Sequence, residues 1–192
     1  MKLVLASKSP RRKEILEMVT TDFTVRTQDA DESYGESTPL ACVPELLAKR
    51  KAMATPIYED EIIIGCDTVV VYENNLLGKP RDKAEAVEML RLLNGTTHQV
   101  ISGICVRTRE KIYSEAVTTY VTFRSLEDEE IISYVEACCP LDKAGAYGIQ
   151  ERAGAFVSKI DGDFYNVVGL PLCRLCQVLK NELGFNIFNL NG

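Results

Sequence analysis

Residues 61–82 have the sequence EIIIGCDTVVVYENNLLGKPRD, and the first half of this stretch decides the fold. Three isoleucines precede Gly65 and three valines follow Thr68, and such β-branched runs are typical of a strand buried on both faces. Asp67 lies inside the run, although an ionised carboxylate is rarely buried unless it is paired, hydrogen-bonded or bound to a metal ion. Gly65 permits a bend or the close approach of another group. Asp67 is therefore either a hydrogen-bonded structural residue in a bulge or a catalytic or metal-binding carboxylate.

The composition is that of an ordinary globular protein. The chain has 192 residues, of which 46% are hydrophobic and 26% are charged, and this predicts one domain, of one or two lobes, that can bury a core. No apolar run of about 18 residues is present, so we expect no contact with a membrane. Apolar residues precede the basic ones at the N-terminus, the reverse of a secretory signal, so we expect a cytoplasmic protein.

The net charge and the cysteines narrow the classes of ligand. A net charge of −6 gives no general attraction to nucleic acid, so any anionic ligand must be bound by a local basic cluster. Cys173 and Cys176 have zinc-like spacing, but a single such pair within a helical pattern is weak evidence for zinc. We therefore expect the seven cysteines to be reduced thiols that pack in the core.

The N-terminal segment predicts a strand over residues 2–6, a turn, and an amphipathic helix to about residue 19. Ser9 has the position of an N-cap and Pro10 that of the first helical residue. The next three residues, Arg11, Arg12 and Lys13, are cations at the positive end of the helix dipole, where each is disfavoured by ~0.3–1 kcal/mol. A bound phosphate chain would reverse the sign of this effect, and the alternative is a solvated basic surface.

An acidic loop and a basic helix follow. Residues 22–28 predict a half-buried strand, and the loop after it contains Asp29, Asp31, Glu32 and Glu36. With Asp67 these acids could complete an oxygen-rich site for Mg²⁺ or Mn²⁺, although such loops are usually only solvated. From Pro44 onward a helix is expected, and one side chain of its basic trio, Lys49, Arg50 and Lys51, could face an anion, the alternative being a solvated surface.

The middle of the chain predicts a turn at residues 73–75 and then a helix. The helix begins with a capping box at Asp82 and Glu85 and ends at residues 94–95. A long antiparallel hairpin follows, with its turn near residues 109–110. Lys79 lies in a Gly/Pro loop, where it is either a phosphate ligand or a surface lysine. His98 is the only histidine, and we expect it to be structural.

In the last third, Ser125 is expected to cap a helix that ends before Pro140. Residues 141–150, LDKAGAYGIQ, are expected to form a loop rich in small residues, which let the backbone approach a ligand closely. In this loop Lys143, Tyr147 and Gln150 offer a charge, a ring and an amide. A strand at residues 156–160, a turn at 161–163 and a helix that enters through 167–171 and is closed by Gly184 complete the chain.

Seven motifs in this order resemble the Maf family of nucleoside triphosphate pyrophosphatases over essentially the whole chain. They are SKSPRR (7–12), Asp31-Glu32, Lys51-Ala52, GCDT (65–68), GKPRD (78–82), LDKAGAYGIQ (141–150) and VGLP (168–171). The resemblance implies an α/β fold in which a twisted mixed β-sheet with flanking helices forms two lobes around a deep cleft, as a single catalytic domain over residues 1–192. It also implies a homodimer.

The resemblance further implies hydrolysis of a nucleoside triphosphate between the α- and β-phosphates with a divalent cation, Mg²⁺ or Mn²⁺. Carried over by motif, Asp67 is the general base that activates water or a metal ligand, and Glu32 helps to hold the cation. The phosphate-binding residues are Ser7, Arg12, Lys51, Lys79 and Lys143, together with Arg11 at the same helix start. Positioning and charge neutralisation are what phosphoryl transfer requires of a protein.

Three positions resemble the family class that acts on dTTP and UTP, namely Arg11, Thr68 and Gln150; the sister class that acts on 7-methyl-GTP has Trp, Gln and Glu there. An amide such as that of Gln150 can pair with both the carbonyl and the N3–H of uracil or thymine. We therefore expect dTTP and UTP as substrates, with CTP and modified pyrimidine nucleotides as further candidates. Gly78 departs from members that have Glu at that position. The alternative function is a non-catalytic nucleotide-binding regulator of cell division and septum formation.

Overall fold

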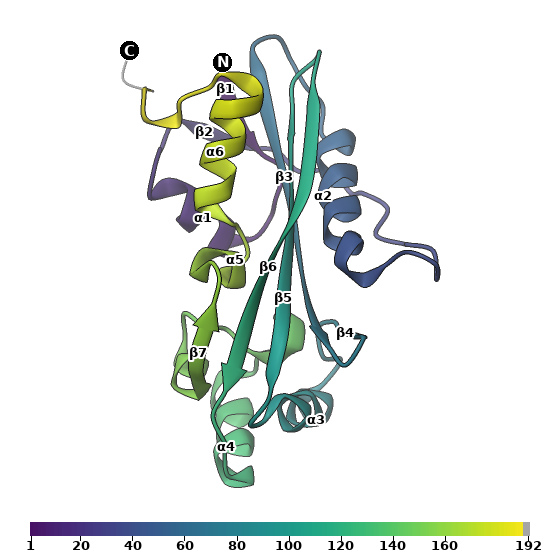
Figure 1. The fold of residues 1–192 in the computed structure, drawn as a ribbon, viewed down its shortest axis with the longest axis vertical. Helices are drawn as coiled ribbons and strands as arrows, with labels where there is room; N and C mark the ends of the chain where they lie inside the picture. The colour runs from purple at the N-terminus through teal and green to yellow at the C-terminus, as the bar shows by residue number, and fades with distance from the viewer. Residues whose placement is uncertain (190–192) are drawn as a thin grey trace. The chain divides into compact units, whose positions relative to one another are not determined.

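The computed structural model describes residues 1–189 as two compact units (Figure 1). Unit 1 contains residues 1–68, 102–117 and 169–189, and unit 2 contains residues 69–101 and 118–168. Three strands, β3, β5 and β6, pass from one unit into the other along the chain. Each unit is therefore assembled from segments that are distant in sequence.

The strands form one mixed seven-stranded sheet, which confirms the expected α/β fold class. Its order is β2-β1-β3-β5-β6-β7, and β4 pairs with β3. The pairs β1–β2 and β1–β3 are parallel, whereas β3–β4 and β6–β7 are antiparallel. The strands are β1 (Lys2–Leu5), β2 (Phe23–Val25), β3 (Glu61–Tyr72), β4 (Asn75–Leu77), β5 (Thr97–Arg107), β6 (Ile112–Phe123) and β7 (Val157–Asp161).

Helices flank the sheet. They are α1 (Pro10–Glu17), α2 (Val43–Ala54), α3 (Lys83–Leu93), α4 (Asp128–Cys138), α5 (Phe164–Val168) and α6 (Leu172–Leu183), with short 3-10 turns at Leu40–Cys42, Ala144–Ala146, Arg152–Phe156 and Ile187–Asn189. Within residues 1–189, no helix has both the length and the apolar character needed to cross a membrane.

In unit 1, α2 lies directly against β3 and β5 (Figure 1). A Cβ atom at Gly65 would clash with the Ala48 carbonyl oxygen and come within 2.9 Å of the Ala52 Cβ, and one at Gly103 would clash with the Pro44 backbone. The two glycines thus let the helix backbone approach the strands, as expected for Gly65. A small apolar cluster fills this contact: Val4, Ala6, Ala48, Ala52, Ile63 and Cys105.

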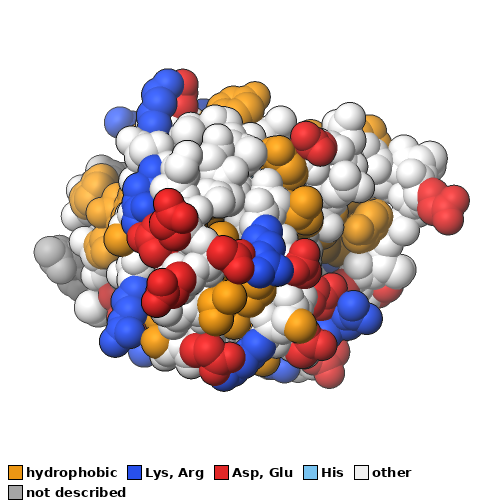
Figure 2. Space-filling model, turned by 90° about the horizontal axis from the view of Figure 1, so that it is seen from below, with side chains coloured by type: hydrophobic (Ala, Val, Ile, Leu, Met, Phe, Trp, Pro, Cys, Tyr) orange, Lys and Arg blue, Asp and Glu red, His pale blue; other side chains and the backbone are white. Residues whose placement is uncertain are grey.

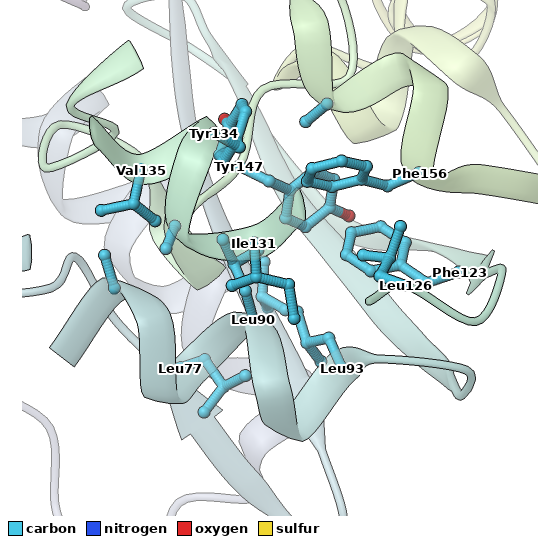
Figure 3. Close-up of a cluster of buried hydrophobic side chains, with 14 of the residues drawn as sticks. Leu77, Leu90, Leu93, Phe123, Leu126, Ile131, Tyr134, Val135, Tyr147 and Phe156 are labelled. Atoms are coloured by element: carbon cyan, nitrogen blue, oxygen red, sulfur yellow. The ribbon is translucent and has the colours of Figure 1, made fainter. Parts of the chain in front are cut away.

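Unit 2 has an aromatic core, drawn in Figure 3. Leu90 and Leu93 of α3 face Ile131 and Val135 of α4 across it. The rings of Phe123, Tyr134, Tyr147 and Phe156 pack edge to face. The ring centroid of Phe123 lies 4.9 Å from that of Tyr147 and 6.1 Å from that of Phe156, and Tyr134 packs against Phe156. Edge-to-face packing is favourable for aromatic rings, so this cluster is a well-defined core.

Charged side chains of both signs cover the face seen in Figure 2, where apolar patches are small. Unit 2 contains three ion pairs, Lys83–Glu136 and Arg124–Glu130, both at 2.6 Å, and Arg91–Asp128 at 2.7 Å. These pairs are exposed to solvent, so each is expected to contribute little to the stability of the fold.

Several local expectations are confirmed and others are wrong. Ser9 is the N-cap of α1, and Gly184, with φ +67°, ends α6. Helix α4 begins after Glu127, which forms a capping box with Glu130, and not at Ser125. The reason is that Leu126 exchanges two hydrogen bonds with Asn94, at 2.7 and 2.9 Å, which hold it outside the helix.

The capping box predicted for α3 forms only in one direction. Asp82 accepts a hydrogen bond from the Glu85 backbone at 2.8 Å, but the Glu85 carboxylate binds the backbone of Arg81 instead.

The cysteines also differ from expectation. Cys66 and Cys105 are buried, but Cys173 and two others are exposed, so the thiols do not all pack in the core.

Candidate active site

Asp67 lies near the middle of β3 in unit 1, and its carboxylate binds the ammonium group of Lys51. Lys51 projects from α2, the helix that rests on β3, and its Nζ also contacts Glu32 Oε1 at 2.9 Å. The Asp67 side chain is 13% exposed and that of Glu32 67% exposed. A single ammonium therefore joins a nearly buried carboxylate to an exposed one.

The acidic loop is held in place by α2. Arg50 pairs with the Asp31 carboxylate at 3.3 Å and donates to the backbone carbonyls of Asp31 and Ser33. Lys51, the next residue of the helix, holds Glu32. Two consecutive basic residues thus position the acids, whereas we expected only one of the trio to have a role. Lys49, the third, is exposed.

The protonation of Lys51 is set by its surroundings. Burial lowers the pKa of Lys51, but the charge of Asp67 and the hydrogen bonds to Asp67 and Glu32 outweigh burial, so the pKa lies above its ordinary value. The like charge of Arg12 opposes this shift, which means that the Arg12 guanidinium lies within electrostatic reach of the ammonium. The raised pKa favours the charged ammonium that binds both carboxylates.

Arg12, in the first turn of α1, is bound by three protein groups. Its Nε donates to the Gly169 carbonyl at 2.9 Å, Nη1 donates to Ser7 Oγ at 3.2 Å, and Nη2 donates to Thr68 Oγ1 at 3.2 Å. A guanidinium has five N–H groups, so two remain for an anionic ligand. Ser7 and Arg12, predicted together as phosphate ligands, are in contact, and Thr68 joins them.

Sequence reasoning missed two groups at this site. The carbonyl of Gly169 accepts hydrogen bonds from Arg12, from the Thr68 hydroxyl at 3.3 Å and from the Cys66 thiol at 3.0 Å. Ser102, fully buried on β5, lies 2.8 Å from Thr68 Oγ1. Gly169 belongs to the VGLP motif and has a φ of +128°, which favours glycine, but the motif does not indicate that its carbonyl accepts these bonds.

The start of α1 has the character expected of an anion site. No acidic side chain lies in its first turn, and the Ser9 side chain makes no capping hydrogen bond. Instead the Ser9 N–H donates to Ser7 Oγ at 3.2 Å. Arg11, predicted to contribute to specificity, is half-buried in the same turn.

The other predicted site residues lie in unit 2. Lys79 and Gln150 are exposed. Lys143 is buried, and its ammonium contacts the carboxylates of Asp142 at 2.8 Å and Glu151 at 3.3 Å. It therefore joins the two ends of loop 141–151, and its role as a phosphate ligand stays a prediction.

The carboxylates of this site suit a divalent cation. Among the residues that the structure describes, no three His, Cys, Asp or Glu side chains gather as a metal-binding group. Asp67 and Glu32 do share one cation, the Lys51 ammonium. Mg²⁺ is commonly held by one or two carboxylates, with substrate phosphates and water as the other ligands. These two carboxylates fit that requirement.

Comparison with known proteins gives the same assignment over the whole chain. The family model for "Maf-like protein" matches residues 2–182. A dTTP/UTP pyrophosphatase of Bacillus cytotoxicus is 46% identical over 93% of this chain and 94% of its own length. Proteins of that name from Alkaliphilus metalliredigens, 47% identical over 97% and 98%, and Bacillus cereus, 45% identical over 97% and 96%, are similar too. The Staphylococcus aureus Ham1 protein, 14% identical over 64% of this chain and 72% of its own, has a TM-score of only 0.44.

Proposed function

Because this chain belongs to the Maf-like protein family, we propose that it is a nucleotide pyrophosphatase that hydrolyses dTTP and UTP to the nucleoside monophosphate and pyrophosphate. The observation that carries the proposal is the Asp67–Lys51–Glu32 contact within electrostatic reach of Arg12. Relatives that are 45–47% identical over nearly the full chain are named for this activity.

In the proposed reaction, a water oxygen forms a bond to the α-phosphorus while the bond from that phosphorus to the bridging oxygen breaks. Pyrophosphate leaves with the bridging oxygen and its electron pair. Asp67 accepts a proton from the attacking water as general base. Its position on the rigid strand β3 supports this role, because a base must be held within hydrogen-bond reach of the proton it removes.

Binding of the phosphates is proposed for Ser7, Arg12, Lys51 and Lys79. The three protein contacts of Arg12 fix the plane of its guanidinium before substrate binds, and this preorganisation lowers the cost of forming charge-assisted bonds to phosphate. Asp67 and Glu32 would hold a divalent cation, Mg²⁺ or Mn²⁺. When bound, the cation supplies charge neutralisation on the phosphates.

Base recognition is proposed for Gln150, whose exposed amide can pair with an imide such as that of uracil or thymine. Arg11 and Thr68 support the same specificity class. Thr68 acts through its hydroxyl, which binds Arg12 and lies beside Ser102. CTP and modified pyrimidine nucleotides are the further substrates to test.

A nucleotide panel tests the proposal. The purified protein is incubated with dTTP, UTP, CTP, ATP and GTP in the presence of Mg²⁺ or Mn²⁺, and pyrophosphate and orthophosphate are measured separately. We expect pyrophosphate without orthophosphate, with dTTP and UTP as the best substrates. Release of orthophosphate, or nucleotide binding without turnover, would contradict the proposal; the second result would favour a non-catalytic regulator.

A further inference from the structure

The only histidine of the chain lies in the core of unit 2 and makes a hydrogen bond to loop 141–151. His98, near the start of β5, is 1% exposed, and its Nε2 lies 2.7 Å from the Tyr147 hydroxyl. Its ring meets the rings of Phe123 and Tyr147 edge to face, with centroids 5.0 and 5.4 Å apart. The histidine is structural, as expected, but its partner belongs to the loop that carries Gln150.

A polar ring is costly at this position. Burial lowers the pKa of His98 to about 4, so the imidazole is neutral at pH 7. Its Nδ1 is buried and has no hydrogen-bond partner among the described residues. An apolar ring would avoid this unsatisfied atom, whose burial without a partner is destabilising. The hydrogen bond to Tyr147 is the one visible compensation.

The loop beside Tyr147 has a strained backbone. Gly145 and Ala146 have φ values of +68° and +61°, and Ala146 is fully buried. A left-handed conformation is strained for a residue other than glycine, and it persists only where surrounding contacts hold it. Tyr147 is the next residue, and its hydroxyl is fixed by His98 while its ring packs against Phe123 (Figure 3).

Two further contacts connect the loop to the predicted ligand groups of unit 2. The Gly145 N–H donates to the Gly78 carbonyl at 3.1 Å, and Gly78 immediately precedes Lys79. The Lys143–Glu151 ion pair, at 3.3 Å, joins the ends of the loop that presents Gln150. Displacement of Tyr147 would therefore shift the positions of both Gln150 and Lys79.

We propose that His98 and Tyr147 are positioning residues for base selection: their hydrogen bond holds loop 141–151 in the one conformation that presents Gln150 to a pyrimidine base. The inference rests on the proposed function for the identity of the ligand. Both side chains are buried in the core of unit 2, so both act through the loop.

The test uses Tyr147→Phe, which keeps the ring and removes the hydroxyl, together with His98→Phe and the double variant. Tyr120→Phe, at an exposed position of β6, is the matched control. Binding of the non-hydrolysable α,β-methylene analogues of UTP and ATP is measured by calorimetry. We expect Tyr147→Phe and His98→Phe to lose about tenfold in preference for the UTP analogue, which corresponds to one hydrogen bond to a positioned group. Hydrogen exchange of the amides in loop 141–151 should be faster in both variants.

The double variant separates positioning from stability. With both polar groups absent, no buried atom is left unpaired by the change, so the melting temperature should recover relative to either single variant. We expect the preference for the UTP analogue not to recover. Recovery of preference and stability together, or single variants with wild-type preference and wild-type exchange, would overturn the proposal.

Failure of the loop proposal can be distinguished from failure of the proposed enzyme function. A wild-type protein that selects the UTP analogue but releases no pyrophosphate from UTP would refute the enzyme assignment and leave the loop experiment valid. A wild-type protein that does not distinguish the two analogues would refute the loop proposal, whatever its turnover.

Discussion

The ammonium group of Lys51 binds the carboxylate of Asp67, so a positive charge lies beside the group proposed to act in catalysis. The same ammonium contacts Glu32 at 2.9 Å. Lys51 therefore offsets part of the negative charge of the two carboxylates proposed to hold a divalent cation.

Replacement of Lys51 by methionine should strengthen cation binding to the nucleotide-free protein. Removal of the competing charge is expected to tighten Mn²⁺ binding by about tenfold, equivalent to about 1.4 kcal/mol. Calorimetry with Mn²⁺ alone measures this, with Lys49→Met on the exposed side of α2 as the control. Turnover should fall in the same variant, because Lys51 is also a proposed phosphate ligand. Mn²⁺ binding that is unchanged or weaker than in the wild type would contradict this account.

Asp67→Asn should abolish catalysis and leave the fold intact. The amide cannot accept the proton of water, so we expect pyrophosphate release from UTP or dTTP to fall by about 10²–10⁴-fold. Circular dichroism and the melting temperature report folding. Asp60→Asn makes the same chemical change in the exposed turn before β3, where Asn tolerates the φ of +59°, and should be fully active. Undiminished turnover by the Asp67 variant would refute the mechanism.

Arg12→Lys should weaken substrate binding although the charge is kept. A lysine cannot reproduce the planar set of bonds to Gly169, Ser7 and Thr68, so the ammonium would not be held in one orientation. We expect KM for UTP to rise by about 10- to 100-fold, from the loss of one or two charge-assisted bonds. Steady-state kinetics give the value, and Arg91→Lys in an exposed ion pair of α3 is the control. A KM within twofold of the wild type would exclude the role.

Gly65→Ala should destabilise the protein severely. The added methyl group would meet the Ala48 carbonyl oxygen and force α2 away from β3. Overpacking of this kind costs typically about 1–3 kcal/mol and more against rigid backbone. Urea unfolding measures the loss. Gly78→Ala, where no atom lies within 4 Å of the new Cβ, should unfold like the wild type. Equal stability of the two variants would mean that α2 is not seated as described.

The Arg26–Glu61 ion pair predicts a specific dependence of stability on pH. Hydrogen bonds from Arg26, at 2.7 and 2.8 Å, lower the pKa of Glu61 from 4.5 to about 2. A lowered carboxyl pKa stabilises the fold above the unfolded value of 4.5, and this contribution is lost as the pH falls from about 4.5 to about 2.

Glu61→Gln should therefore lower the free energy of unfolding by about 1 kcal/mol at pH 7, a value reduced for exposure to solvent, and by little near pH 2. Urea unfolding at several pH values measures the difference. Glu59→Gln, exposed in the preceding turn, should change stability by less at every pH. A difference between wild type and Glu61→Gln that does not change with pH would rule out the ion pair as its source.

The elements that sequence predicted well are those that a local pattern determines. β3 follows from its β-branched run, and the start of α1 follows from Ser9 and Pro10. The failures have tertiary causes. Helix α4 starts two residues late because Asn94, distant in sequence, binds Leu126. Helix α5, of five residues, was not predicted, since so short a segment has no periodicity to detect.

The candidate site was predictable in its residue types and not in its connections. Motifs identified Ser7, Arg12, Lys51 and Asp67, and the structure brings all four into unit 1. No pattern indicates that a backbone carbonyl, that of Gly169, joins Arg12, Thr68 and Cys66, because any residue supplies a carbonyl. The buried Lys143 was predicted for phosphate from its charge alone, without knowledge of its two acidic partners.

The hydrogen bond from Arg12 to Gly169 also has a consequence for how the protein is made. Its partners are 157 residues apart, so Arg12 is synthesised long before the carbonyl that it binds. A nascent chain that ends before Gly169 has an arginine without its carbonyl and a first unit without α6. Contacts of such long sequence separation form late in folding. In such a fragment Arg12 lacks one of its three anchoring bonds, so a ribosome-bound chain that ends before Gly169 should not consume nucleotide.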